Sequence, residues 1–75
     1  MNNSIFFLYL NFFVNGEEYF IENFEISKEE YDFLLSLLLK EDLNKLKKEI
    51  KERYLKRYNG KVYFIFLSLI EKKKT

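Results

Sequence analysis

The dipeptide Asn15-Gly16 is the feature that most constrains the fold of this 75-residue chain. It separates two segments, 5–14 and 17–26, that are rich in aromatic and aliphatic residues and contain no proline. A two-residue type I′ turn needs positive φ at both central positions, which Asn and Gly tolerate best. The pattern therefore predicts a β-hairpin with strands 5–14 and 17–26 and a turn at 15–16.

A two-residue turn also determines which side chains share a face, because side chains alternate along a strand. It places Glu17 opposite Val14 and Tyr19 opposite Phe12. We expect this face, which is apolar at its centre, to be the core face. The opposite face then carries an aromatic set, consisting of Phe7, Tyr9, Phe13, Phe20 and Phe24.

The segment 28–58 has the features of a helix. Ser27 and Glu30 form a capping box at its start, and Asn59-Gly60 is typical of a helix end. A continuous helix over 28–58 would be about 46 Å long, whereas a compact domain of this size has a radius of gyration of about 11 Å. We therefore expect either one overhanging helix or a break near residues 40–43, with Asp42 as a second N-cap.

The second half of this helical region is amphipathic. Its predicted buried stripe recurs at spacings of four, three and four residues and consists of Leu39, Leu43, Leu46 and Ile50. A third strand is predicted at 62–70, followed by a basic tail at 71–75.

Pairing of the third strand with the first gives an antiparallel sheet with strand order 2-1-3. This order places the most apolar strand in the middle and the glutamate-rich strand at an edge, where charge opposes aggregation. We predict a single α+β domain of two layers, ββαβ, in which one long or broken helix covers one face of the sheet.

One helical layer leaves the other sheet face uncovered. An exposed patch of aromatic side chains marks an interface. The aromatic set is therefore a candidate protein-binding surface, and its partner is either a second copy of the chain, which would make a homodimer, or a foreign protein.

Charge is distributed unevenly along the chain. Residues 17–32 have a net charge of −6 and residues 45–61 a net charge of +6. The acidic segment is a second candidate protein-binding surface that would imitate a phosphate backbone, through Glu17, Glu18, Glu22, Glu25, Glu29 and Glu30. The basic segment is a candidate nucleic-acid surface, through Lys47, Lys48, Lys51, Arg53, Lys56 and Arg57. Basic residues near a helix C-terminus also offset the helix dipole, so nucleic acid is the second choice of partner.

The composition argues against enzymatic chemistry. The chain has no His and no Cys, so the usual proton shuttle, the thiolate nucleophile and soft metal sites are missing. Its neighbouring carboxylates are adjacent in sequence and point apart on a helix or strand. We predict no catalytic site, no metal and no cofactor.

The two apolar runs, 5–14 and 62–70, are too short for a helix that spans a bilayer, which needs about 20 residues. Membrane association is therefore not favoured, and a cytoplasmic location is expected.

Residue usage indicates an AT-rich genome. Lys, Asn, Ile, Phe and Tyr are abundant, whereas Ala, Pro and Gln are absent. Together with the small size, this favours an accessory protein of a phage or mobile element. We therefore predict a non-enzymatic protein-binding module, as in an inhibitor of a host protein complex of the anti-defence or anti-CRISPR type. The alternative is a small nucleic-acid-binding protein that uses the basic helix.

Overall fold

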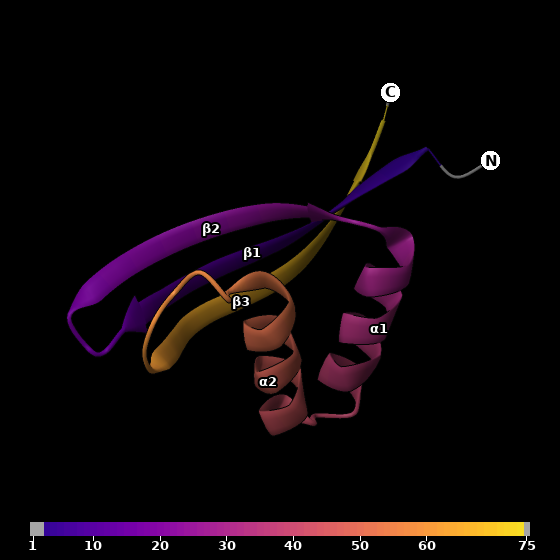
Figure 1. The fold of residues 1–75 in the computed structure, drawn as a ribbon. Helices are drawn as coiled ribbons and strands as arrows, with labels where there is room; N and C mark the ends of the chain where they lie inside the picture. The colour runs from indigo at the N-terminus through magenta and orange to yellow at the C-terminus, as the bar shows by residue number, and fades with distance from the viewer. Residues whose placement is uncertain (1–2, 75) are drawn as a thin grey trace.

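The computed structural model describes residues 3–74. Strands β1 (Ser4–Val14), β2 (Glu18–Ile26) and β3 (Val62–Lys73) form one antiparallel sheet in the order β2-β1-β3. Helices α1 (Lys28–Leu39) and α2 (Leu43–Tyr54) connect β2 to β3 and lie on the same face of the sheet (Figure 1). The predicted α+β class and strand order are confirmed, but the element order is ββααβ rather than ββαβ.

The helical region reverses direction between its two halves, so of the two predicted alternatives the continuous helix is wrong and the broken one is correct. Glu41 N–H donates to the Leu38 carbonyl and Asp42 N–H to the Leu37 carbonyl, each at 3.0 Å. This pair of bonds is the Schellman arrangement that ends many helices. The Asp42 side chain then accepts from Lys45 N–H at 3.4 Å and begins α2. The break near residues 40–43 and the second N-cap are as predicted.

Because of this reversal, only half of the predicted buried stripe is buried. Leu46 and Ile50 are buried, but Leu39 and Leu43, which flank the reversal, are exposed. Helix α2 ends at Tyr54, four residues before the predicted end, and the next residue, Leu55, is fully buried in the core. The chain thus leaves the helix at Leu55 and buries this side chain, and the helical turn predicted up to residue 58 does not form.

The hairpin turn has three residues, Asn15–Glu17, which corrects the predicted register. Asn15 and Gly16 have positive φ as expected, and Glu17 N–H donates to the Val14 carbonyl at 3.1 Å. However, Glu18 rather than Glu17 is opposite Val14. A shift of one residue turns every β2 side chain to the other face of the sheet.

The shift has a clear energetic reason. It places Phe20, Phe24 and Ile26 on the face that the helices cover, where they pack against the core. The predicted register would have buried Tyr19, Ile21 and Asn23 there instead. Burial of more apolar surface is favourable at roughly 25 cal/mol per Å², so packing overrides the two-residue turn preference.

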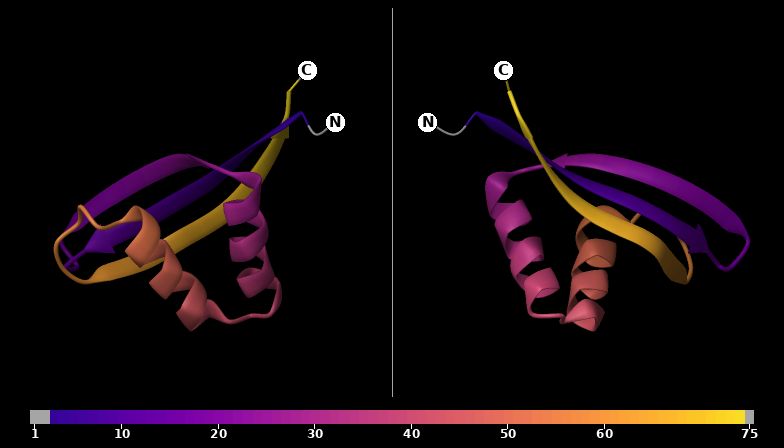
Figure 2. Two further views of the ribbon diagram at one scale, coloured as in Figure 1. Left: turned by 45° about the vertical axis from the view of Figure 1, so that its right-hand side comes forward. Right: turned by 180° about the vertical axis from the view of Figure 1, so that it is seen from behind.

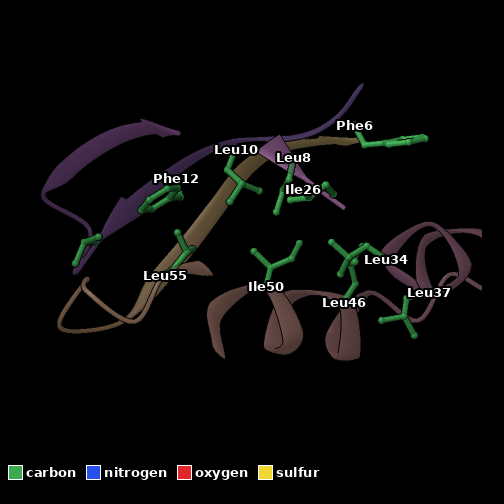
Figure 3. Packing of buried hydrophobic residues seen from close by; sticks show 11 residues of the cluster. Phe6, Leu8, Leu10, Phe12, Ile26, Leu34, Leu37, Leu46, Ile50 and Leu55 are labelled. Atoms are coloured by element: carbon green, nitrogen blue, oxygen red, sulfur yellow. The ribbon is translucent and has the colours of Figure 1, made fainter. Parts of the chain in front are cut away.

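The core lies between the sheet and the helix pair (Figure 3). Alternate residues of β1 form its sheet side, and three leucines and one isoleucine of the helices form its helix side. Its buried members are Phe6, Leu8, Leu10, Phe12, Val14, Ile26, Leu34, Leu37, Leu46, Ile50 and Leu55.

Strand β3 runs beyond its predicted end, since Glu71 to Lys73 continue the pairing with β1. The pairing contains an irregularity next to Asn11 and Phe12, where Ile65 is the extra residue on β3. This bulge changes the alternation, so that Phe64 and Leu67, three residues apart, both pack against the core.

Candidate protein interface

The sheet surface opposite the helices is here named the open face. Figure 2 shows that neither helix reaches this side of the sheet. Its members are alternate residues of each strand: Ile5, Phe7, Tyr9, Asn11 and Phe13 from β1, Tyr19, Ile21, Asn23 and Glu25 from β2, and Tyr63, Phe66, Ser68, Ile70 and Lys72 from β3.

The open face contains only part of the predicted aromatic set. Phe7, Tyr9 and Phe13 lie on it and are half-buried between their neighbours. Phe20 and Phe24 do not, because the three-residue turn moves them to the core side of the sheet. Phe20 stacks on Phe12 there, with ring centroids 5.7 Å apart.

Four apolar side chains on the open face are about half exposed, between 48% and 56%: Tyr19, Ile21, Tyr63 and Phe66. They flank β1 in matched pairs. Tyr19 and Tyr63 both pair with Phe13, and Ile21 and Phe66 both pair with Asn11. The sequence prediction named none of the four, although it expected alternate residues of the third strand on this face. The register error hid the β2 pair, while β3 is apolar on both faces and its bulge breaks the alternation.

Asn11 lies in the middle of the open face. Its Oδ1 atom is buried, and among residues 3–74 it is the one buried side-chain oxygen or nitrogen that has no hydrogen-bond partner. An unpaired buried acceptor costs about 1–3 kcal/mol. Such a group in a native structure calls for an explanation, and one explanation is a partner molecule.

The end of the open face near the chain termini carries two charges. Glu25 is opposite Phe7, and Lys72 is opposite Ile5 with its Nζ 5.8 Å from the centre of the Phe7 ring. Within the described part of the chain, neither side chain takes part in an ion pair. The face therefore combines a largely apolar surface, with Asn11 in its middle, with one acidic and one basic corner.

A second apolar surface borders the free edge of β3. It is a groove of about 270 Å³ between this edge and the corner of the helix pair. Leu38, Leu43, Ile65 and Leu67 line it, and the neighbouring Leu39 is 75% exposed. This groove is separate from the open face, although Phe66 borders both.

The predicted acidic and basic surfaces partly neutralise each other. Arg53 Nη1 donates to Glu30 Oε1 at 2.6 Å, and Arg53 Nε donates to Glu49 Oε1 at 2.9 Å. The Tyr54 hydroxyl donates to the second Glu30 oxygen at 2.6 Å. Burial, followed by this bond and the charge of Glu30, raises the pKa of Tyr54 well above its usual value. These contacts join the start of α1 to the end of α2.

Glu22 forms a second such cluster. Because of the register shift, it lies on the helix side of β2, where its carboxylate accepts from Arg57 and from the Tyr58 hydroxyl. Arg57 also donates to Tyr58 at 3.0 Å. Glu17, Glu18, Glu25 and Glu29 of the predicted acidic surface remain exposed, as do Lys47, Lys48, Lys51 and Lys56 of the basic one.

Residues 3–74 contain no cluster of three or more His, Cys, Asp or Glu side chains that would hold a metal ion. Across the same range, each helix falls short of the length and apolarity required to cross a membrane. No protein-family model, curated protein or solved structure matches this chain.

Proposed function

We propose that this chain is a small non-enzymatic protein-binding domain and that the open face is its binding surface. The observation that carries the proposal is the group of four half-exposed apolar side chains beside the central strand. Contact between water and a continuous apolar surface is unfavourable, and monomeric proteins rarely expose such patches beyond a few hundred Å². Covering the face with another polypeptide removes that contact.

Residue usage supports a narrower form of this proposal, an inhibitor of phage or mobile-element origin that binds a host protein complex, of the anti-defence or anti-CRISPR type. The exposed carboxylates of Glu17, Glu18 and Glu29 would then attract a basic target surface and raise the association rate.

A paired capture experiment tests the binding surface. The tagged chain is immobilised and exposed to a nuclease-treated lysate of a low-GC bacterium to which untagged chain has been added. Phe66→Lys places a charge on the open face, and Leu39→Lys places the same charge on an exposed leucine of the helix corner. We expect Phe66→Lys to retain at least tenfold less of the captured polypeptides, whereas Leu39→Lys behaves as the unaltered chain. Equal capture by all three proteins would contradict the proposal.

Nucleic-acid binding is the second candidate function, and the exposure of four lysines on and just after α2 supports it. Lys47, Lys48 and Lys51 are the residues to replace, because Arg53 already binds two carboxylates of its own chain. If this function is correct, affinity for a short duplex falls steeply with salt and is lost in the triple Lys→Glu variant. The open-face variant Phe66→Lys would leave that affinity unchanged.

A further inference from the structure

We infer that the polypeptide covering the open face is a second copy of this chain, packed sheet to sheet about a two-fold axis that runs along β1 and passes beside Asn11. The inference rests on the proposed function, since it names the partner of the same face. Three properties of the open face support it: the matched pairs beside β1, the unpartnered Asn11 and the two charged corners.

The pairs beside β1 become contacts between copies. A two-fold axis along β1 stacks β1 on its counterpart and places β2 over the partner's β3. Tyr19 then meets the partner's Tyr63, because both lie at the level of Phe13. Ile21 meets the partner's Phe66 at the level of Asn11 in the same way. The twist of packed sheets, about 30°, makes this correspondence closest near the axis.

Polar residues match under the same operation. Asn23 and Ser68 both lie at the level of Tyr9, so an amide on one copy meets a hydroxyl on the other. Each contact occurs twice, as two-fold symmetry requires.

Asn11 gains the partner that it lacks within one chain. Packed sheets lie about 10 Å apart, a separation that two facing asparagine side chains bridge through a hydrogen bond. An amide both donates and accepts, so it is complementary to itself across a two-fold axis. The last torsion of the side chain is broad, which lets the amide turn toward the partner. A single polar residue in an apolar interface also fixes the register, as asparagine does in coiled coils.

Two sheets that pack face to face can be related by a two-fold axis along the strands or by one across them, and the charged corners distinguish the two. With the axis along β1, Glu25 lies over the partner's Ile70 with the partner's Lys72 next to it, so opposite charges meet twice. An axis across the strands that passes beside Asn11 would invert the levels and bring Glu25 near the partner's Glu17 in the hairpin turn. It would also bring Lys72 near the partner's Lys61. Like charges at close range are unfavourable, so the charge pattern selects the axis along β1.

The available area is sufficient for a stable dimer. The four half-exposed side chains offer roughly 100 Å² each when covered. The half-buried residues between them and the charged corners extend the contact toward the roughly 800 Å² per partner that specific interfaces bury.

Sedimentation equilibrium on the purified, untagged chain tests the dimer. We expect a mass of twice the 9.3 kDa of one chain. Ile21→Lys and Phe66→Lys should each raise the dimer dissociation constant at least a hundredfold, whereas Leu39→Lys should leave it unchanged. Circular dichroism would serve as the control that each variant is folded. A monomeric unaltered chain at 100 μM would overturn the inference. If the capture experiment still showed loss with Phe66→Lys, the proposed function would stand and the partner would be a foreign protein.

Two further experiments test the arrangement. Asn11→Asp places two like charges on the axis and should weaken the dimer at least tenfold, whereas the uncharged Asn11→Leu should not. The chain has no cysteine, so Asn23→Cys and Ser68→Cys each introduce a single thiol. A short bismaleimide should cross-link a mixture of these two variants at least fivefold faster than either variant alone. Equal rates, or an Asn11→Asp dimer as tight as the original, would exclude the axis along β1.

Discussion

At the scale of single residues, Asn15 has a larger role than the turn signal indicated. Its Oδ1 accepts from Lys61 N–H at 2.9 Å, and its own N–H donates to the Lys61 carbonyl at 2.8 Å. The residue that turns β1 into β2 thus also holds the loop that leads into β3. Gly60 makes this contact possible, because a Cβ there would lie 2.3 Å from Asn15 Oδ1.

We expect Gly60→Ala to lower the free energy of unfolding by about 1–3 kcal/mol. Its φ of +124° is unfavourable for alanine, and the added methyl group would push Asn15 away from Lys61. Gly16→Ala is the matched control, since its φ is also positive but nothing lies within 4 Å of the added atom. We expect it to cost about 1 kcal/mol. Urea denaturation measures both, and equal losses would show that the Asn15 contact does not matter.

The Tyr54 hydroxyl gives the stability a dependence on alkaline pH. Its pKa is raised in the folded protein, so above the ordinary tyrosine value of about 10 the unfolded chain loses this proton while the folded chain keeps it. The unfolded state then binds fewer protons, and the free energy of unfolding falls as the pH rises. The contribution is fully present below pH 10.

We therefore expect Tyr54→Phe to be less stable than the unaltered chain by about 1 kcal/mol at pH 7, where it lacks the bond to Glu30. The difference should shrink as the pH rises from 10 to 11.5. Tyr63→Phe, on the open face, is the control for general alkaline effects. Urea denaturation at several pH values gives the comparison, and a constant difference would contradict the assignment.

At the scale of elements, local sequence signals determine where the helices begin, whereas long-range packing determines the length of the hairpin turn. Ser27 was correctly predicted as the N-cap, and its Oγ accepts from Glu30 N–H at 3.1 Å. The Glu30 side chain binds Arg53 and Tyr54 instead of completing the predicted capping box. Asp42 was correctly predicted as the second N-cap. Capping is local and therefore visible in sequence. The three-residue turn was not visible, because the burial of Phe20 and Phe24 determines it, and those residues meet the helices only in the folded chain.

The end of α1 also lacked a clear sequence signal. A Schellman turn usually has glycine at the residue with positive φ, but here Glu41 occupies it at φ 58°. The sequence was therefore equally compatible with a continuous and a broken helix. Without a glycine to mark the end of α1, the sequence also did not show which leucines of the segment 34–39 would face the core.

We expect Glu41→Gly to raise the free energy of unfolding by about 0.5–1 kcal/mol. Glycine removes the strain of a left-handed residue, about 1–2 kcal/mol, and part of the gain is offset by its greater freedom in the unfolded chain. Glu41→Ala keeps the strain and serves as the control for loss of the carboxylate. Thermal or urea denaturation decides the matter, and a Glu41→Gly protein no more stable than Glu41→Ala would argue against this turn.

At the scale of the whole molecule, the charge asymmetry along the chain acts largely within it. The acidic and basic segments meet where Glu30 binds Arg53 and where Glu22 binds Arg57. The distribution of charge along the sequence predicted two opposed charged surfaces, and the fold brings them together because the helix pair returns α2 to the sheet. The part of the candidate site that sequence did predict, Phe7, Tyr9 and Phe13, lies on the central strand, whose alternation the turn length does not affect.

A dimer would add to the stability of a chain this small. A chain of this length buries only about 60% of its unfolded surface and is marginally stable alone. If the folded form is a dimer, unfolding separates two chains, and each tenfold rise in protein concentration should stabilise the folded form by about 1.4 kcal/mol. We expect the urea midpoint to rise between 2 and 200 μM protein. Phe66→Lys, which is designed to be monomeric, should unfold at the same urea concentration throughout. If the midpoint of the unaltered chain does not move over this range, the open face is not covered by a second copy at these concentrations. Its aromatic side chains would then bind a different protein.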